Sequence, residues 1–108
     1  MLKFRVKGSN GGEYKVQAKL VEGVIVLKCS CPAGTSGHYC KHRVSLLDGD
    51  ADILASTNAS DLSTLAQWVR GTRLELAYKE KISAEAAYQE ATERVKRANA
   101  DLARALHG

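Results

Sequence analysis

Three cysteines and one histidine, all between positions 29 and 42, are the residues of this chain best suited to chemistry. Every cysteine of the 108-residue sequence lies in this segment, in the order Cys-x-Cys, eight residues, then Cys-x-His. Three thiolates and one imidazole are the ligand set of a closed, tetrahedral structural zinc site. We therefore predict that Zn²⁺ is bound by Cys29, Cys31, Cys40 and His42.

Other uses of these side chains explain the pattern less well. A disulfide would leave one cysteine unpaired, and Cys29 and Cys31 are too close in sequence to be bridged without strain. A catalytic Cys–His pair would give the other two thiols no role. His38 is the open alternative in the ligand set, because it precedes Cys40 by two residues and its imidazole is as competent a ligand as that of His42.

The same residues resemble a known family. Cys29-Ser-Cys-Pro-Ala-Gly and Cys40-Lys-His are similar to the SWIM zinc finger, and the resemblance covers residues 1–50. It implies a short β-sheet before the first ligand pair, a helix starting at the second pair, and zinc held by the four residues named above. Members of this family are thought to bind DNA or protein partners rather than to catalyse a reaction.

The segment before the first ligand pair has the pattern of three strands. Residues 2–7 and 14–20 alternate between apolar and polar side chains, and Val24 to Leu27 is a short apolar run leading to Cys29. The turn segments 9–12 and 22–23 contain glycine. We predict an antiparallel three-stranded meander whose last strand delivers the first ligands. Because residues 1–50 are too few to bury much apolar surface, we expect zinc to contribute to folding.

Basic residues are concentrated in this half of the chain. Residues 1–50 contain eight Lys or Arg and four Asp or Glu, whereas residues 51–108 contain eight of each. The strand alternation places five bases on one face, and two more flank the predicted ligand His42. The candidate nucleic-acid contacts are therefore Lys3, Arg5, Lys7, Lys15, Lys19, Lys41 and Arg43. A surface of this kind suits phosphates, although lysines on an exposed sheet face also serve solubility.

The second half is predicted to be helical. A short helix is expected over residues 40–47, and residues 51–59 form a linker or one further turn. From Ser60 onward Ala, Leu, Glu, Arg and Lys dominate, as long helices require. Gly71 either ends a first helix, with Thr72 to Glu75 as the capping box of a second, or lies within a continuous one.

The last helix carries a heptad seam of apolar residues. The seam comprises Ala84, Tyr88, Ala91, Val95, Ala98, Leu102 and Ala105. It can fold back as an intrachain helical hairpin or form a coiled coil with a second copy. We favour the homodimer through residues 60–108, because one chain has too few apolar residues to cover such a length.

These patterns predict an α+β fold: a small three-stranded antiparallel sheet with a zinc knuckle and helix, followed by long C-terminal helices. The expected divisions are a finger module at 1–50, a linker at 51–59 and a helical arm at 60–108. No secretory or membrane-spanning segment is evident, so we expect a cytoplasmic protein without a membrane partner. We predict a non-enzymatic zinc module that binds DNA and self-associates, with no small-molecule substrate. A protein-interaction adaptor that binds no nucleic acid is the alternative.

Overall fold

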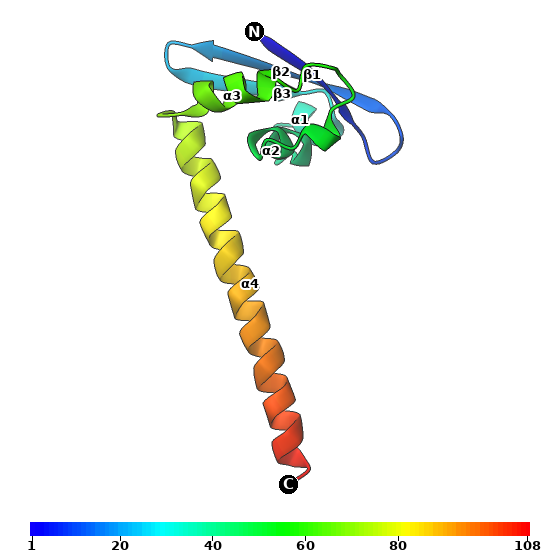
Figure 1. Ribbon diagram of the computed structural model, residues 1–108, viewed down its shortest axis with the longest axis vertical. Helices are drawn as coiled ribbons and strands as arrows, with labels where there is room; N and C mark the ends of the chain where they lie inside the picture. Colours follow the sequence, from blue (N-terminus) through cyan, green and yellow to red (C-terminus); the bar gives the residue numbers. More distant parts are fainter. The chain divides into compact units, whose positions relative to one another are not determined.

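The computed structural model describes residues 1–108 and has the predicted α+β architecture (Figure 1). Its elements are β1 (Leu2–Lys7), β2 (Glu13–Val21), β3 (Val24–Cys29), α1 (Pro32–Thr35), α2 (Lys41–Leu47), the 3-10 helix η1 (Ala51–Ile53), α3 (Asp61–Val69) and α4 (Arg73–Leu106). The chain forms two compact units, Met1–Glu75 and Leu76–Gly108. The predicted fold class is confirmed.

The three strands form an antiparallel sheet in the order β1-β2-β3. The register pairs Phe4 with Val16 and Val16 with Cys29, so the inward-facing residues of all three strands lie side by side. Alternation along each strand then divides the sheet into an apolar inner face and a polar outer face. The alternation of residues 14–20 predicts that Leu20 faces inward with Val16 and Ala18. Leu20 lies near the end of β2, however, and is 43% exposed.

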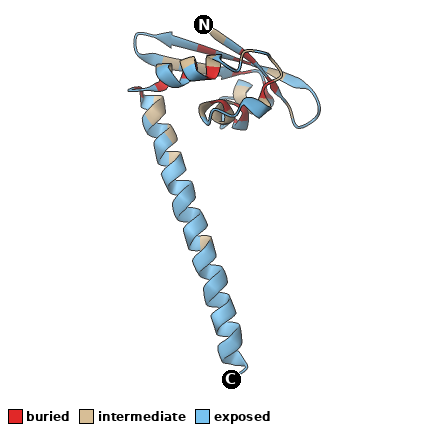
Figure 2. Ribbon diagram, viewed as in Figure 1, coloured by how far each residue is buried: buried red, intermediate tan, exposed pale blue.

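The core of the first unit lies between the inner face of the sheet and the helices that cover it. Its largest fully buried side chains are Phe4, Leu46, Leu65, Val6 and Val16. These come from β1, β2, α2 and α3, so the two helices share one hydrophobic cluster with the sheet. Figure 2 shows the buried residues gathered in this layer.

The outer edge of β1 is covered by the segment that follows η1. The Ala55 amide donates to the Arg5 carbonyl, and the Arg5 amide donates to Ser56 Oγ at 3.1 Å. Further along the strand, Asn58 Nδ2 donates to the Lys3 carbonyl at 2.8 Å. These bonds satisfy backbone groups that an open edge strand would leave exposed to pairing with other chains.

The helical region is broken at Gly71. That residue has φ +77°, a conformation that glycine adopts without strain, and α4 begins two residues later. The capping box forms in part: Thr72 Oγ1 accepts from the Glu75 amide, but Glu75 Oε1 accepts from the Gly71 amide, one residue before the N-cap. The chain therefore has two helices here instead of one continuous helix.

The helix α3 lies in the same compact unit as the finger, although the predicted arm began at residue 60. The physical reason is burial: Leu62, Leu65 and Val69 all enter the core beneath the sheet. Trp68 and Leu74 pack at the margin of the same cluster.

No residue of α4 is buried, as Figure 2 shows. The seam residues Tyr88, Val95 and Leu102 are 74%, 59% and 58% exposed. An intrachain hairpin would bury them, so the seam is unpartnered within one chain. No helix combines the length and apolar composition needed to cross a bilayer.

Candidate metal centre

The four predicted ligands come from the ends of three neighbouring elements. Cys29 is the last residue of β3, Cys31 is the N-cap of α1, and Cys40 is the N-cap of α2. His42 lies in the first turn of α2. The sequence patterns predict no helix between the two ligand pairs, yet α1 occupies Pro32–Thr35. It forms because Pro32 suits the first helical position and the Cys31 sulfur accepts the Gly34 amide at 3.2 Å.

The ligand atoms are spaced as tetrahedral zinc requires. Cys31 Sγ lies 3.4 Å from Cys40 Sγ, and His42 Nδ1 lies 3.6 Å from Cys40 Sγ and 3.9 Å from Cys29 Sγ. All four atoms lie within 4.8 Å of one another. Ordinary Zn–S and Zn–N bonds at tetrahedral angles give edges of about 3.8 Å between sulfurs and about 3.6 Å between sulfur and nitrogen. The four side chains therefore fit a zinc ion.

The geometry also separates the two candidate histidines. His42 is buried and belongs to the cluster, whereas His38 is exposed and does not. Nδ1 of His42 faces the thiols, while the buried Nε2 has no hydrogen-bond partner. The ring of Tyr14 lies 5.1 Å from the imidazole, tilted by 50°. Tyr14 therefore helps to hold the orientation in which Nδ1 points to the metal.

The protonation of the thiols shows how much the site depends on a cation. Burial raises the pKa of Cys29 to about 12. Burial also opposes ionisation of Cys40, but hydrogen bonds from the Arg43 backbone and from Cys31 and His42 outweigh it and lower the pKa of Cys40 to about 6. At neutral pH without metal, Cys40 is therefore a thiolate whereas Cys29 keeps its proton. Zinc must displace the proton of Cys29, so acid competes with zinc for the site.

Arg43 connects the ligand-bearing segments to each other. Its Nη1 donates to the Leu27 carbonyl at 3.1 Å, and its Nη2 donates to the His38 carbonyl at 2.6 Å. The guanidinium thus links β3 to the loop that precedes Cys40. Arg43 was predicted to contact nucleic acid, but in the structure its side chain is half-buried and supports the metal site. Lys41 is exposed at the start of α2.

We expect Arg43→Ala to weaken zinc binding although Arg43 is not a ligand. Loss of both carbonyl contacts frees the loop that carries Cys40, and changes in groups that orient metal ligands typically cost about 10–100-fold in affinity. Competition with a chromophoric chelator measures the change. Lys41→Ala removes a neighbouring charge but leaves the two hydrogen bonds of Arg43 in place, so it should leave zinc affinity unchanged. Equal affinity of the two variants would contradict a supporting role for Arg43.

The remaining predicted residues lie on the outer face of the sheet. Lys3, Arg5, Lys7, Lys15 and Lys19 are all exposed there. Lys7 is partly engaged, since its Nζ donates to the Asp52 carbonyl at 3.1 Å. Lys28, which sequence reasoning missed, joins this face because the register places it beside Gln17. Lys28 lies two residues after Val26 and four after Val24, so the alternation along β3 could have predicted that it faces outward.

The comparisons with known proteins agree with the geometry. Residues 4–48 match the profile of the SWIM zinc finger family, and this match includes all four metal ligands. No curated protein and no solved structure matches the chain. Residues 4–48 are therefore similar to a SWIM zinc finger, and the cluster of three cysteines and one histidine in the same residues supports zinc binding by this chain. The C-terminal helix has no family match.

Proposed function

We propose that this zinc module is a non-enzymatic DNA-binding protein that contacts phosphates through the outer face of its sheet and pairs with a second copy through α4. The observation that carries the DNA-binding part is the charge of that face. Six basic residues occupy it, namely Lys3, Arg5, Lys7, Lys15, Lys19 and Lys28, and Glu13 is the one acidic strand residue among them.

The centre of this face contains a destabilising pair of like charges. Arg5 lies directly opposite Lys15 in the register, and like charges in cross-strand pairs are destabilising. The ion pair between Arg5 and Glu13, at 3.4 Å, is exposed on both sides and offsets little of this repulsion. An anionic ligand would relieve it, which is the expected role of a phosphate backbone.

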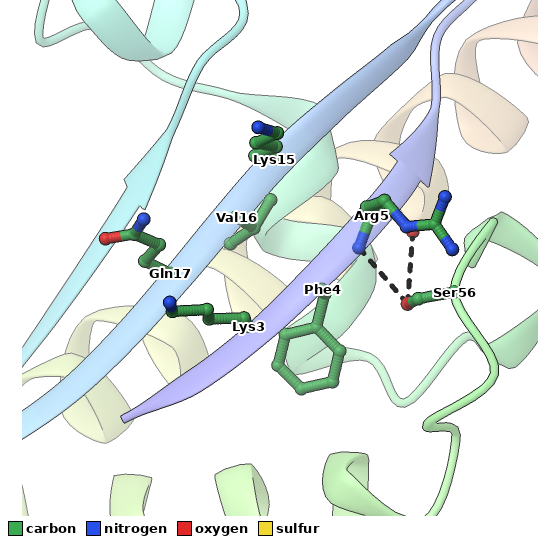
Figure 3. Close-up of a pocket in the computed structure, with 7 residues that line it drawn as sticks. All are labelled: Lys3, Phe4, Arg5, Lys15, Val16, Gln17 and Ser56. Atoms are coloured by element: carbon green, nitrogen blue, oxygen red, sulfur yellow. Dashed lines mark hydrogen bonds between the residues drawn. The ribbon is translucent and has the colours of Figure 1, made fainter.

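A hollow of about 310 Å³ lies at the same place. Figure 3 shows Lys3, Lys15 and Gln17 on the neighbouring strands β1 and β2 around it, with Arg5 hydrogen-bonded through its backbone to Ser56. The side chains combine ammonium, guanidinium and amide donors. Such donors bind phosphate oxygens without reading base sequence, so we expect affinity with little sequence preference.

DNA binding is tested by fluorescence anisotropy with a short labelled duplex at several salt concentrations. If three basic side chains each neutralise one phosphate, the counterions released on binding should give a slope of log K against log salt concentration of about −3. Charge reversal of Lys3, Arg5 and Lys15 together should abolish most of the affinity and flatten the slope. Reversal of Lys79, Lys96 and Arg97 in α4 is the charge-matched control, and it should bind nearly as the parent does. No binding at low salt would refute the proposal.

A second candidate function rests on an apolar corner of the same face. Val21, Val24 and Val26 are 54%, 60% and 38% exposed at the end of the β2–β3 hairpin. Exposed clusters of this kind are typical of protein-interaction surfaces. A partner that binds equally well after reversal of the sheet lysines, but not after Val24→Asp, would favour the adaptor function.

The zinc site supports a structural role instead of catalysis. Four protein ligands fill a tetrahedral coordination sphere and leave no position for water or substrate. We accordingly propose that the metal holds the finger in shape, while the sheet and α4 make the contacts.

The exposed seam of α4 supports the proposed self-association. An isolated helix gains little stability from propensity alone, and an apolar stripe of this length is stabilised by a partner. Light scattering of the full chain should give the mass of a dimer. The variant Tyr88→Glu with Val95→Glu should give the mass of a monomer, with the finger still folded.

A further inference from the structure

The seam of α4 sorts its residues by size. One edge of the heptad holds only alanine, namely Ala77, Ala84, Ala91, Ala98 and Ala105. The other edge holds larger side chains, namely Lys81, Tyr88, Val95 and Leu102. A shallow groove of about 500 Å³ on this helix includes Ala91 and Ala98 of the alanine edge, and it is lined also by Val95, Arg94, Arg97 and Asp101.

We infer that two copies of this chain pair through α4 in antiparallel orientation, an inference that rests on the self-association proposed above. In a parallel dimer each seam residue faces its own copy, so layers of Ala with Ala would alternate with layers of Tyr with Tyr. If the helices were far enough apart to fit two tyrosines in one layer, the neighbouring layers of two alanines would leave voids between the helices. In an antiparallel pair with the register described below, Lys81, Tyr88 and Val95 each face an alanine, while Leu102 lies beyond the first seam alanine of the partner subunit. These layers are closer to one another in width than the alternating layers of a parallel pair, so the helices pack with smaller voids.

Lys81 provides an independent argument for the same orientation. In a parallel pair the two Lys81 ammonium groups would lie opposite each other inside the seam. Like charges held together there are unfavourable. In an antiparallel pair Lys81 faces an alanine, so its aliphatic stem can lie across the small side chain while its ammonium reaches solvent. Its ion pair with Glu85 on the same helix is compatible with that arrangement.

The charges that flank the seam also favour an antiparallel pair. In a parallel dimer Glu80 would face Glu85 of the partner subunit, twice in each dimer, and no opposite charges would meet. The antiparallel register in which Ala87 faces its own copy places Glu80 opposite Arg94 of the partner subunit, again twice, against one like-charge contact, that of Glu85 with its own copy. Sliding the helices by one or two heptads instead brings Glu80 against Asp101 of the partner subunit, or Arg94 against its own copy.

Distances between nitroxide labels test the orientation directly. Each label is attached to a cysteine introduced at Gln89 or at Ala103 in the zinc-loaded full chain, and the unsubstituted protein shows whether zinc-bound thiols react. Both positions lie outside the seam. In an antiparallel dimer the pair of labels at Gln89 should be close. The pair at Ala103 should be about 50 Å apart along the axis, or about 40 Å after a slide of one heptad, from the rise of 1.5 Å per residue.

The other outcomes overturn the inference in distinguishable ways. Equally short distances at both positions, with a dimeric mass, would mean a parallel dimer, so that self-association would stand and the antiparallel orientation would fail. A monomeric mass with no dipolar coupling at either position would remove self-association itself. DNA binding by the sheet would be unaffected in both cases. A long distance at Ala103 with a short one at Gln89 supports the inference.

Discussion

Replacing Cys31 with serine is expected to abolish stoichiometric zinc binding and to unfold the finger. Structural zinc sites contribute about 10–16 kcal/mol of binding free energy, whereas whole domains are stable by only about 5–15 kcal/mol. Cys31 both supplies a ligand and caps α1 through its sulfur. The loss therefore removes more free energy than the small core can replace.

The single tryptophan reports this change. Trp68 packs at the margin of the core, so its fluorescence should shift to that of a solvated indole when the finger unfolds. Far-ultraviolet circular dichroism is less suitable, because α4 carries much of the helical signal and only Leu74, near its start, packs against that core. Metal content is measured in parallel, and one zinc per chain is expected in the parent protein.

A matched histidine substitution separates ligand loss from general damage. His38→Ala removes an imidazole that lies close in sequence but outside the cluster, so zinc content and tryptophan emission should stay as in the parent. His42→Ala should behave as Cys31→Ser does. A Cys31→Ser protein that is free of zinc yet shows native emission and cooperative melting would contradict the dependence of the fold on metal.

The local patterns of the sequence predicted the sheet and the ligands because both depend on short-range rules. Alternation from Leu2 to Lys7 sets which side chains enter the core, and the observed strand has these bounds. The spacing of Cys29, Cys31 and Cys40 likewise predicts three ligands, whereas His38 and His42 both suit the fourth, and only the folded chain places His42 in the cluster.

Other features could not be predicted because they depend on tertiary contacts. Arg43 has the composition of a surface base, and only the folded chain shows the two carbonyls that its guanidinium reaches. The α3 helix has an apolar face that would suit a second helix or the sheet equally well, and the position of the core decides between them. Lys28 joins the basic face only through the register of β3 on β2.

The two compact units of the molecule differ in what they bury and what they expose. The finger uses zinc and a small core to hold a sheet whose outer face is basic, and α3 completes that core. The seam of α4 remains exposed. The proposed DNA-binding and pairing surfaces therefore belong to separate compact units, so we expect that each can be altered by mutation without changing the other.

Gly34→Ala is the second substitution with a large expected effect, and its sign is opposite to that of most glycine replacements in helices. Alanine at a helical glycine is normally stabilising by about 1 kcal/mol. At Gly34, however, an added Cβ would lie 2.5 Å from the carbonyl oxygen of Cys29 and 2.9 Å from the Cys29 Cβ. The backbone of a zinc ligand would have to move.

We therefore expect Gly34→Ala to lower the free energy of unfolding by about 2 kcal/mol, as forced repacking does, and to weaken zinc binding by about 10–100-fold. Chelator competition and thermal melting measure the two effects. Gly37→Ala is the control from the same loop, where an added Cβ meets nothing within 4 Å but φ is +74°. It should reduce stability by about 1 kcal/mol through backbone strain and leave zinc affinity intact. If the two variants bound zinc equally well, close packing of α1 on Cys29 would not be what sets the position of that ligand.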